Sequence, residues 1–318
     1  MSAPLIVAVP SKGRLKEQVE EWLADCGLDL KVSGGARGYL AALKGQAGVQ
    51  VRLLSAGDIA EALDAGEAHL GVTGEDLLRE RGGDLDARVL LLRALGFGRA
   101  DLVVAAPRSW LDVDTMADLE AVAHDFLARS GRRMRVATKY LVQTRAFFAR
   151  HGLVDYRITE SSGATEGAPA AGAAELIVDI TTTGATLAAN GLKVLSDGLI
   201  LSSQAQFAAS LRAAWSANQL AAAERLLRII EARAAAHESA TVIWPAEAGE
   251  SPGLVDRLVA EGAVRRPGGL LVAARDLSNV ALELAAAGMG PVTVSRPDFV
   301  FDLGCPPFER LRRKLAQF

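Results

Sequence analysis

The chain has 318 residues, which at the usual size of about 150 residues each predicts two or three domains. Half of the residues are hydrophobic but only 5% are aromatic, so the core must consist mainly of Ala, Val, Leu and Ile. The net charge of -3, from 35 basic and 38 acidic side chains, gives no overall attraction to nucleic acid or to an anionic membrane. Any anion site must therefore be local.

The two cysteines are too few for a disulfide framework or a Cys-rich metal site. The N-terminal residues lack the basic region and the long apolar run of a signal peptide. No stretch reaches the roughly 20 apolar residues that a membrane span needs. A soluble, cytoplasmic protein is expected.

Short β-rich runs alternate with longer helical patterns, which predicts an α/β fold with parallel sheets. The clearest strands are 5–9, 51–54, 70–73, 101–106, 135–137 and 176–180. Helical spacing of apolar residues predicts helices over 15–26, 58–65 and 144–151, and a long one over 218–236. We expect two lobes, one of residues 1–97 completed by 198–236, and one of residues 98–197.

After His237 the pattern changes, and residues 238–318 are expected to form a third, small α/β domain. Strands are predicted at 241–244 and 270–274, helices at 252–261 and 277–287, and a last strand at 292–294 or 299–301. The basic, amphipathic segment 308–315 is predicted to be a surface helix packed on this same domain, rather than a nucleic-acid or membrane contact.

The loop Asp179-Ile-Thr-Thr-Thr-Gly-Ala-Thr186 carries the strongest chemical signal. A strand, a hydroxyl-rich turn with Gly184 and a helix start make an anion cradle, because backbone N–H groups and Thr hydroxyls converge there. Asp179 lies near the carboxyl end of its strand, where ligands of α/β sheets bind, and can accept hydrogen bonds from ribose hydroxyls. The alternative interpretation is an ordinary polar turn with a helix cap.

Several motifs resemble ATP phosphoribosyltransferase, the first enzyme of histidine biosynthesis. The best matches are Gly163–Pro169 and Gly172–Leu192, and the others, in order, are 9–15, 56–59, 70–76, 95–102 and 136–140. The resemblance implies a core of two lobes similar to type II periplasmic binding proteins, and a small ferredoxin-like domain at the C-terminus. It implies transfer of the phosphoribosyl group of phosphoribosyl pyrophosphate (PRPP) to N1 of ATP, with Mg²⁺ as cofactor.

For PRPP, the residues expected to bind are Asp179, Thr181, Thr182, Thr183, Gly184, Ala185 and Thr186. For ATP they are Lys12, Gly13, Arg14, Arg37, Asp58, Gly74, Glu75 and Asp76. Lys12 and Arg14 suit a triphosphate or pyrophosphate, although a solvated basic turn is the alternative. Asp58 has the alternative role of a helix N-cap.

Glu166 is a candidate to bind Mg²⁺, through water, or to orient a ribose hydroxyl. Transfer at the ribose C1 passes through an oxocarbenium-like state, by analogy with glycoside chemistry, and needs no covalent nucleophile. We therefore expect Asp179 and Glu166 to hold the sugar while Lys12 and Arg14 stabilise pyrophosphate.

The length of the chain resembles the long form of the family, which implies histidine as a feedback inhibitor and a homo-oligomer, either a dimer or a hexamer built from dimers. Compared with that form, the middle of the third domain is short by about one strand. Two other functions stay open at this point. One is a solute-binding module, which shares the two-lobed fold. The other is a phosphoribosyltransferase acting on another base, or a regulatory relative without activity.

Overall fold

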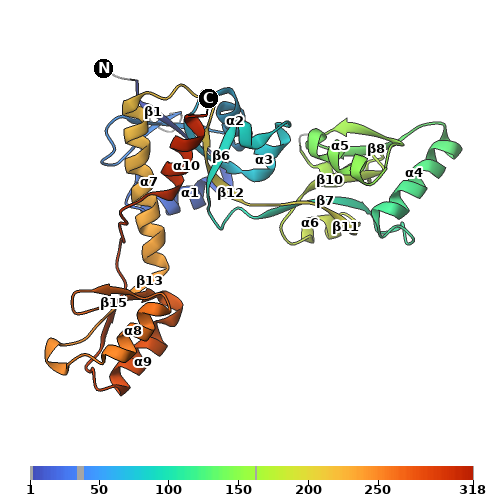
Figure 1. The fold of residues 1–318 in the computed structure, drawn as a ribbon. Helices are drawn as coiled ribbons and strands as arrows, with labels where there is room; N and C mark the ends of the chain where they lie inside the picture. The colour runs from blue at the N-terminus through green and yellow to red at the C-terminus, as the bar shows by residue number, and fades with distance from the viewer. Residues whose placement is uncertain (1–2, 34–38, 162, 318) are drawn as a thin grey trace.

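The computed structural model describes residues 3–33, 39–161 and 163–317. These residues form three β-sheets, each in a body of its own (Figure 1). The first lobe and the C-terminal domain are joined by the long helix α7 (Ala217–His237), and the second lobe extends sideways from the first. No helix in this described part of the chain is long and apolar enough to cross a membrane.

The sheet of the first lobe has the strand order β2-β3-β4-β1-β5-β12-β6. Its strands are β1 (Leu5–Pro10), β2 (Leu30–Ser33), β3 (Leu40–Leu43), β4 (Val49–Leu54), β5 (Leu70–Gly74), β6 (Val89–Ala94) and β12 (Ala205–Ser210). Helices α1 (Gly13–Asp25), α2 (Ala56–Ala65) and α3 (Glu75–Glu80) follow β1, β4 and β5. Strand β12 returns from the second lobe and lies between β5 and β6. Two separate segments of the chain therefore build this lobe.

The sheet of the second lobe has the order β11-β7-β10-β8-β9. Its strands are β7 (Ala100–Pro107), β8 (Met134–Thr138), β9 (Tyr156–Glu160), β10 (Leu176–Thr181) and β11 (Leu192–Ser203). Its helices are α4 (Met116–Ser130), α5 (Leu141–Arg150) and α6 (Ala185–Ala189). The chain changes sheet between Ala94 and Ala100 and again after Ser203, so the second crossing comes later than the expected boundary at residue 197.

The expectation of parallel sheets was only partly right. Strand β1 is parallel to β4 and β5, and β8 is parallel to β9 and β10. The crossing strands β7, β11 and β12 run antiparallel to their neighbours because they enter each sheet from the other lobe. Both large sheets are therefore mixed.

The C-terminal sheet consists of β13 (Ser239–Ile243), β14 (Val264–Arg266), β15 (Gly269–Ala273) and β16 (Thr293–Ser295) in the order β14-β15-β13-β16. With α8 (Pro252–Ala260) and α9 (Leu277–Ala286) the elements run β-α-β-β-α-β, the ferredoxin-like pattern. The expected shortage of one strand was wrong: β14 has three exposed residues, Val264, Arg265 and Arg266, and so gives no apolar signal. The predicted fold class is confirmed.

The last helix, α10 (Pro306–Leu315), corrects another expectation. It packs on the first lobe, beside α7 and β6, and not on the C-terminal sheet (Figure 1). Phe308 and Leu311 are buried in the core of the first lobe, and the Arg310 guanidinium donates to the Leu92 carbonyl at 2.7 Å. The apolar face of this amphipathic helix therefore packs against the core of the first lobe.

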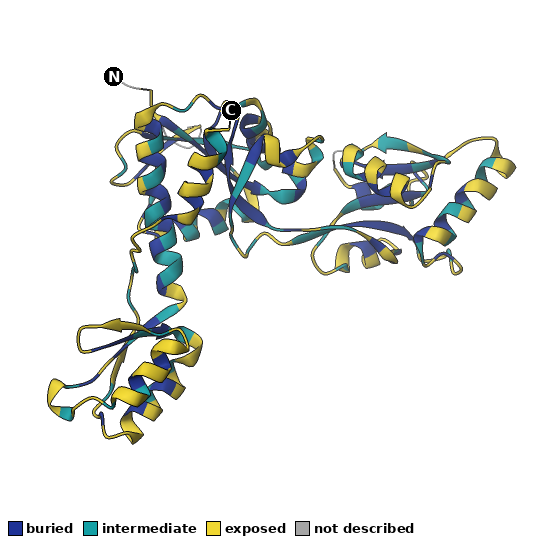
Figure 2. Ribbon diagram, viewed as in Figure 1, coloured by how far each residue is buried: buried dark blue, intermediate teal, exposed yellow. Residues whose placement is uncertain are grey.

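Buried residues follow the strands of all three sheets, while the outer sides of α4 and α9 are exposed (Figure 2). Short 3-10 turns occur at Leu85–Ala87, Thr165–Gly167, Ala246–Ala248 and Ala274–Asp276. The two lobes meet at two places. One is the pair of crossing strands, where the Ala205 N–H donates to the Phe97 carbonyl at 3.0 Å. The other is the contact between α3 and α5.

Candidate active site

The carboxyl ends of β8 and β10 form the edge of the second lobe that faces the first. Residues Leu176 and Ile177 pair in parallel with Val136 and Ala137, and continuing this register brings Asp179 beside Lys139. Burial raises the pKa of Asp179 above its ordinary value, and the nearby Glu166 carboxylate raises it further, against the opposing effects of the Ile180 N–H and Lys139. Two acidic side chains and one cation therefore meet at this edge.

Glu166 lies in the 3-10 turn Thr165–Gly167, at the end of a bent loop. Ala164, at φ 51°, is the non-glycine residue with positive φ among those described, a strained conformation that often occurs at functional sites. The Thr165 side chain is buried, and its hydroxyl lies 3.1 Å from the Ser161 hydroxyl, within hydrogen-bond distance. Thr165 also helps to lower the pKa of Asp179, so Glu166 follows a buried residue that lies close to Asp179.

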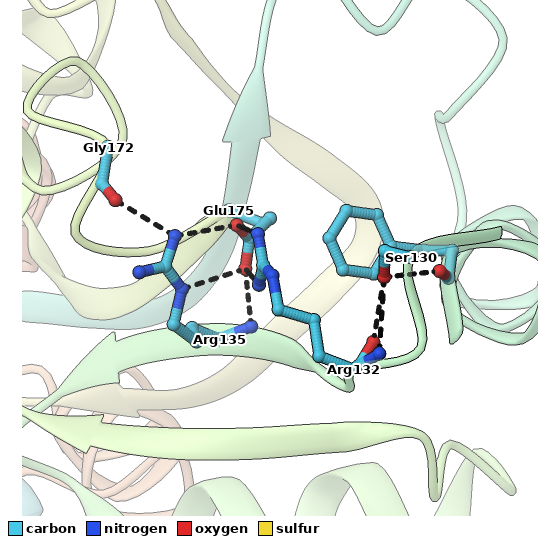
Figure 3. Close-up of polar contacts among 6 residues, drawn as sticks. Ser130, Arg132, Arg135, Gly172 and Glu175 are labelled. Atoms are coloured by element: carbon cyan, nitrogen blue, oxygen red, sulfur yellow. Dashed lines mark hydrogen bonds and ion pairs between the residues drawn. The ribbon is translucent and has the colours of Figure 1, made fainter. Parts of the chain in front are cut away.

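The C-terminal end of this loop is anchored by Glu175 (Figure 3). Its carboxylate accepts hydrogen bonds from the Arg135 N–H at 2.6 Å and from the guanidinium groups of Arg132 and Arg135 at 2.9 Å. Arg135 also donates to the Gly172 carbonyl at 2.8 Å. Burial opposes ionisation of Glu175, but the hydrogen bonds from Arg135 and Arg132 prevail and hold its pKa at about 2. The loop is therefore fixed to the start of β8.

The threonine loop after β10 is exposed and satisfies part of its own hydrogen bonding. The Gly184 N–H donates to the Thr181 hydroxyl at 2.9 Å, and the Ala185 N–H to the Thr183 hydroxyl at 3.4 Å. Gly184 has φ 74°, which a side chain would strain. The side chains of Thr182, Thr183 and Thr186 are exposed. These three hydroxyls are therefore open to an anionic ligand, which would have to replace the Thr181 and Thr183 hydroxyls as acceptor of the two N–H groups.

The turn at Gly74–Asp76 has the same order of strand, turn and helix, but it is closed. Asp76 is 6% exposed, and its carboxylate accepts from the Ser203 hydroxyl at 2.8 Å and from the Tyr140 hydroxyl at 2.6 Å. Glu75 pairs with Arg79 at 2.6 Å and accepts from Gln206 at 2.9 Å. A side chain at Gly74 would clash, because its Cβ would lie 2.2 Å from Asp76 Oδ1.

Lys12, Gly13 and Arg14 open α1 at the carboxyl end of β1, and all three are exposed. Leu15 lies beside Gly98, because a Cβ at Gly98 would be only 3.1 Å from Leu15 Cδ1. The next residue, Arg99, accepts a hydrogen bond from the Thr182 hydroxyl through its carbonyl at 3.3 Å. The basic turn and the threonine loop are therefore near the same crossing strand.

Two further candidates are placed differently. Asp58 is exposed in the first turn of α2, but the N-cap is Ser55, whose hydroxyl accepts from the Asp58 N–H at 3.2 Å. The expected capping role of Asp58 was therefore wrong, since the helix begins two residues earlier, at Ala56. Arg37 lies outside the described residues.

Three residues at the site were not among the candidates. Lys139 and Tyr140 follow β8, and the rule that ligands bind at carboxyl ends of strands applied to β8 as much as to β10. Lys139 Nζ lies 4.9 Å from the centre of the Tyr140 ring. Arg99 lines a pocket with Asp101, Thr181, Thr182, Ser202 and Gln204. Arg99 lies in the matching motif 95–102, as Lys139 and Tyr140 lie in 136–140, but no role was assigned to any of the three.

Comparison with known proteins decides the family. The ATP phosphoribosyltransferase (HisG) family matches residues 55–232. The chain belongs to the ATP phosphoribosyltransferase family. An ATP phosphoribosyltransferase of Caulobacter vibrioides is 66% identical over 316 residues, which cover 99% of both chains. One of Bradyrhizobium is 50% identical over 98% of both.

The fold agrees with this family. A solved structure of the ATP phosphoribosyl transferase (HisG:HisZ) complex from Thermotoga maritima is 25% identical, with a TM-score of 0.53. The match covers 71% of this chain and 98% of that chain. The protein is an ATP phosphoribosyltransferase of histidine biosynthesis, and its substrates are ATP and PRPP. Membership of this family decides against the solute-binding module and against a phosphoribosyltransferase for another base.

Proposed function

We propose that the edge formed by Asp179, Glu166 and the threonine loop binds the phosphoribosyl half of PRPP. The observation that carries this assignment is the half-buried Asp179 at the carboxyl end of β10, beside Glu166 and directly before the exposed hydroxyls of Thr182 and Thr183. The N–H groups of Gly184 and Ala185, with these hydroxyls, bind the 5'-phosphate. Asp179 and Glu166 accept hydrogen bonds from the ribose hydroxyls.

The other side of the proposed substrate-binding cleft, which lies between the two lobes, comes from the first lobe. Lys12 and Arg14 are exposed cations at the end of β1, so they are free to pair with phosphate groups. We assign them to the pyrophosphate and the ATP triphosphate, with Gly13, Gly74 and Glu75 beside the nucleotide. Arg99, also exposed, adds a cation between the two walls. Asp76 supports this side of the site without binding substrate itself, because its carboxylate already accepts hydrogen bonds from Ser203 and Tyr140.

The carboxylates fit a magnesium ion that is held mainly by substrate. Among the described residues, no group of three or more His, Cys, Asp or Glu side chains is arranged to hold a metal by itself. Mg²⁺ usually keeps several waters and binds through one or two carboxylates plus substrate phosphates. Glu166, with Asp179 next to it, would hold the ion through water. The bound ion would supply positive charge to the pyrophosphate leaving group.

These residues perform the transfer by positioning and electrostatics. As the bond from C1 to pyrophosphate breaks, negative charge grows on the leaving group and positive charge on the ribose ring. Lys12 and Arg14 stabilise the former, and the carboxylates of Asp179 and Glu166 the latter. The adenine N1 supplies its lone pair to C1, so the step needs no protein nucleophile. Alignment of the two substrates across the cleft provides the rest of the acceleration.

We propose that the C-terminal domain binds histidine as a feedback inhibitor, and that the protein acts as a homo-oligomer, either a dimer or a hexamer built from dimers. The complete β-α-β-β-α-β pattern of this domain supports a ligand-binding role.

The two free cysteines, Cys26 and Cys305, are both buried, which fits the reducing conditions of the cytoplasm.

A spectroscopic assay of adduct formation from ATP, PRPP and Mg²⁺ tests the assignment. Arg14→Ala should lower kcat/KM about 100-fold, in the range of lost transition-state donors. Lys44→Ala is the matched control, since Lys44 is an exposed cation of the first lobe that pairs with Asp29 at 3.3 Å. Equal kinetics of the two variants would contradict the role of the basic turn. Saturating histidine should inhibit the unmodified protein in the same assay, and full activity would refute the regulatory assignment.

A further inference from the structure

Helix α5 begins at the candidate site without a cap of its own. Its N-cap residue, Tyr140, makes no side-chain hydrogen bond to the helix. The first N–H groups of a helix have no partner within the helix and must be satisfied elsewhere. The position matters because Lys139 and Tyr140, which lie beside Asp179, directly precede this helix.

The missing cap comes from the other lobe. Glu80, at the end of α3, accepts from the Val142 N–H at 2.8 Å and from the Gln143 N–H at 3.2 Å. The negative charge also interacts favourably with the positive end of the α5 dipole. The Gln143 side chain donates in return to the Asp76 carbonyl at 2.9 Å. One helix of the first lobe thus caps one helix of the second.

A buried hydrogen bond and an apolar contact reinforce this junction. The Tyr140 side chain is fully buried, and its hydroxyl donates to Asp76 Oδ2 at 2.6 Å. Burial, and next the Asp76 carboxylate, raise the pKa of Tyr140 far above its ordinary value, so the hydroxyl keeps its proton. Leu77 packs against the cores of both lobes.

We propose that this α3–α5 junction, formed by Asp76, Glu80, Tyr140 and Gln143, is a clamp that couples the two substrate halves of the cleft. Its first-lobe end begins at the turn assigned to ATP, and its second-lobe end fixes Lys139 and Tyr140 beside Asp179. The crossing strands act as the hinge and the clamp sets the angle between the lobes. Glu80 and Tyr140 are positioning residues, because neither is assigned a contact with substrate.

The inference rests on the PRPP site proposed above, and kinetics give its first test. Glu80→Ala should raise the KM for PRPP about tenfold, within the usual range of coupling free energies, with little change in ATP affinity measured without PRPP. Glu80→Gln keeps one accepting oxygen, so its KM for PRPP should lie between those of the unmodified protein and Glu80→Ala. Asp125→Ala, on the exposed face of α4, should match the unmodified protein. A Glu80→Ala variant that loses stability but keeps its PRPP KM would overturn the proposal.

The angle between the lobes can be measured apart from the chemistry. Labels attached through Ala65→Cys on α2 and Ala128→Cys on α4, both exposed, report the distance between the lobes. The native Cys26 and Cys305 are buried, and burial raises the pKa of Cys26 to about 11, so both react slowly. Glu80→Ala and Tyr140→Phe should broaden the distance distribution, and an unchanged distribution would refute the clamp. If Glu80→Ala and Tyr140→Phe broaden the distribution while Asp179→Ala still binds PRPP normally, the clamp is supported and the assignment of the PRPP site is refuted.

Discussion

The two turns that follow β5 and β10 have the same local design but opposite environments. Each joins a strand to a short helix through a glycine, with an acidic residue nearby: Asp179 in β10 before one turn, and Asp76 in α3 after the other. After β10, the hydroxyl groups remain exposed and Asp179 has another carboxylate, Glu166, as neighbour. After β5, Asp76 is buried and its oxygens are taken by Ser203 and Tyr140.

The difference shows that the same motif can serve ligand binding or assembly. Asp179 lies in surroundings that disfavour its charge, which is the usual cost of a functional carboxylate. Asp76 instead accepts hydrogen bonds from two buried hydroxyl groups, those of Tyr140 and Ser203, as a structural acid does. Variants at the two positions should therefore separate activity from stability.

The largest effect is expected at Asp179. Asp179→Ala should lower kcat/KM for PRPP by about 100- to 1,000-fold, because the ribose loses its acceptor in the transition state. Its free energy of unfolding should stay the same or rise, since a pKa that folding raises means that the charged form destabilises the fold at neutral pH. Steady-state kinetics and urea unfolding measure both. A large loss of stability in Asp179→Ala would instead indicate that Asp179 is a structural acid, like Asp76.

Asp76 should behave in the opposite way. Asp76→Ala leaves the buried hydroxyls of Tyr140 and Ser203 without their acceptor and should lower the free energy of unfolding by about 2–4 kcal/mol. Thermal unfolding and urea titration give this value. Asp58→Ala is the matched control, because Asp58 is also an acid in the first turn of a first-lobe helix but is exposed. Equal stability of both variants would remove the contrast between the turns.

The smallest effect is expected at Glu175, a structural acid at the far end of the loop that carries Glu166. Glu175→Gln should cost about 1 kcal/mol at neutral pH, since its arginine partners are partly exposed to water, which screens the pairing. Folding lowers the pKa of Glu175 from 4.5 to about 2, so its stabilisation is complete above 4.5 and is lost as the pH falls through 2. Unfolding curves of both proteins should converge over this range. A constant difference would exclude the carboxylate charge as the cause.

The sequence predicted the apolar strands well and the polar ones poorly. The runs at β1, β5 and β10 are apolar enough to be read directly, whereas β9 (Tyr156–Glu160) and β14 (Val264–Arg266) alternate or are wholly exposed. At the site, the sequence indicated which residues carry charge, and the resemblance supplied their order. It could not show that Asp76 meets Tyr140, since these residues are 64 positions apart and the contact depends on how the lobes meet.

The position of the C-terminal helix α10 determines how the third domain is connected to the rest of the chain. The chain leaves the first lobe through α7 and returns along that same helix, where the Val300 N–H donates to the Ala232 carbonyl at 2.9 Å and Arg233 donates to the Asp298 carbonyl at 2.8 Å. The ferredoxin-like domain is therefore an insertion held at both of its ends, not an appendage on one linker. A chain that stopped after α7 would lose Phe308 and Leu311 from the core of its first lobe. Removing the domain cleanly would require excising it and rejoining α7 to α10.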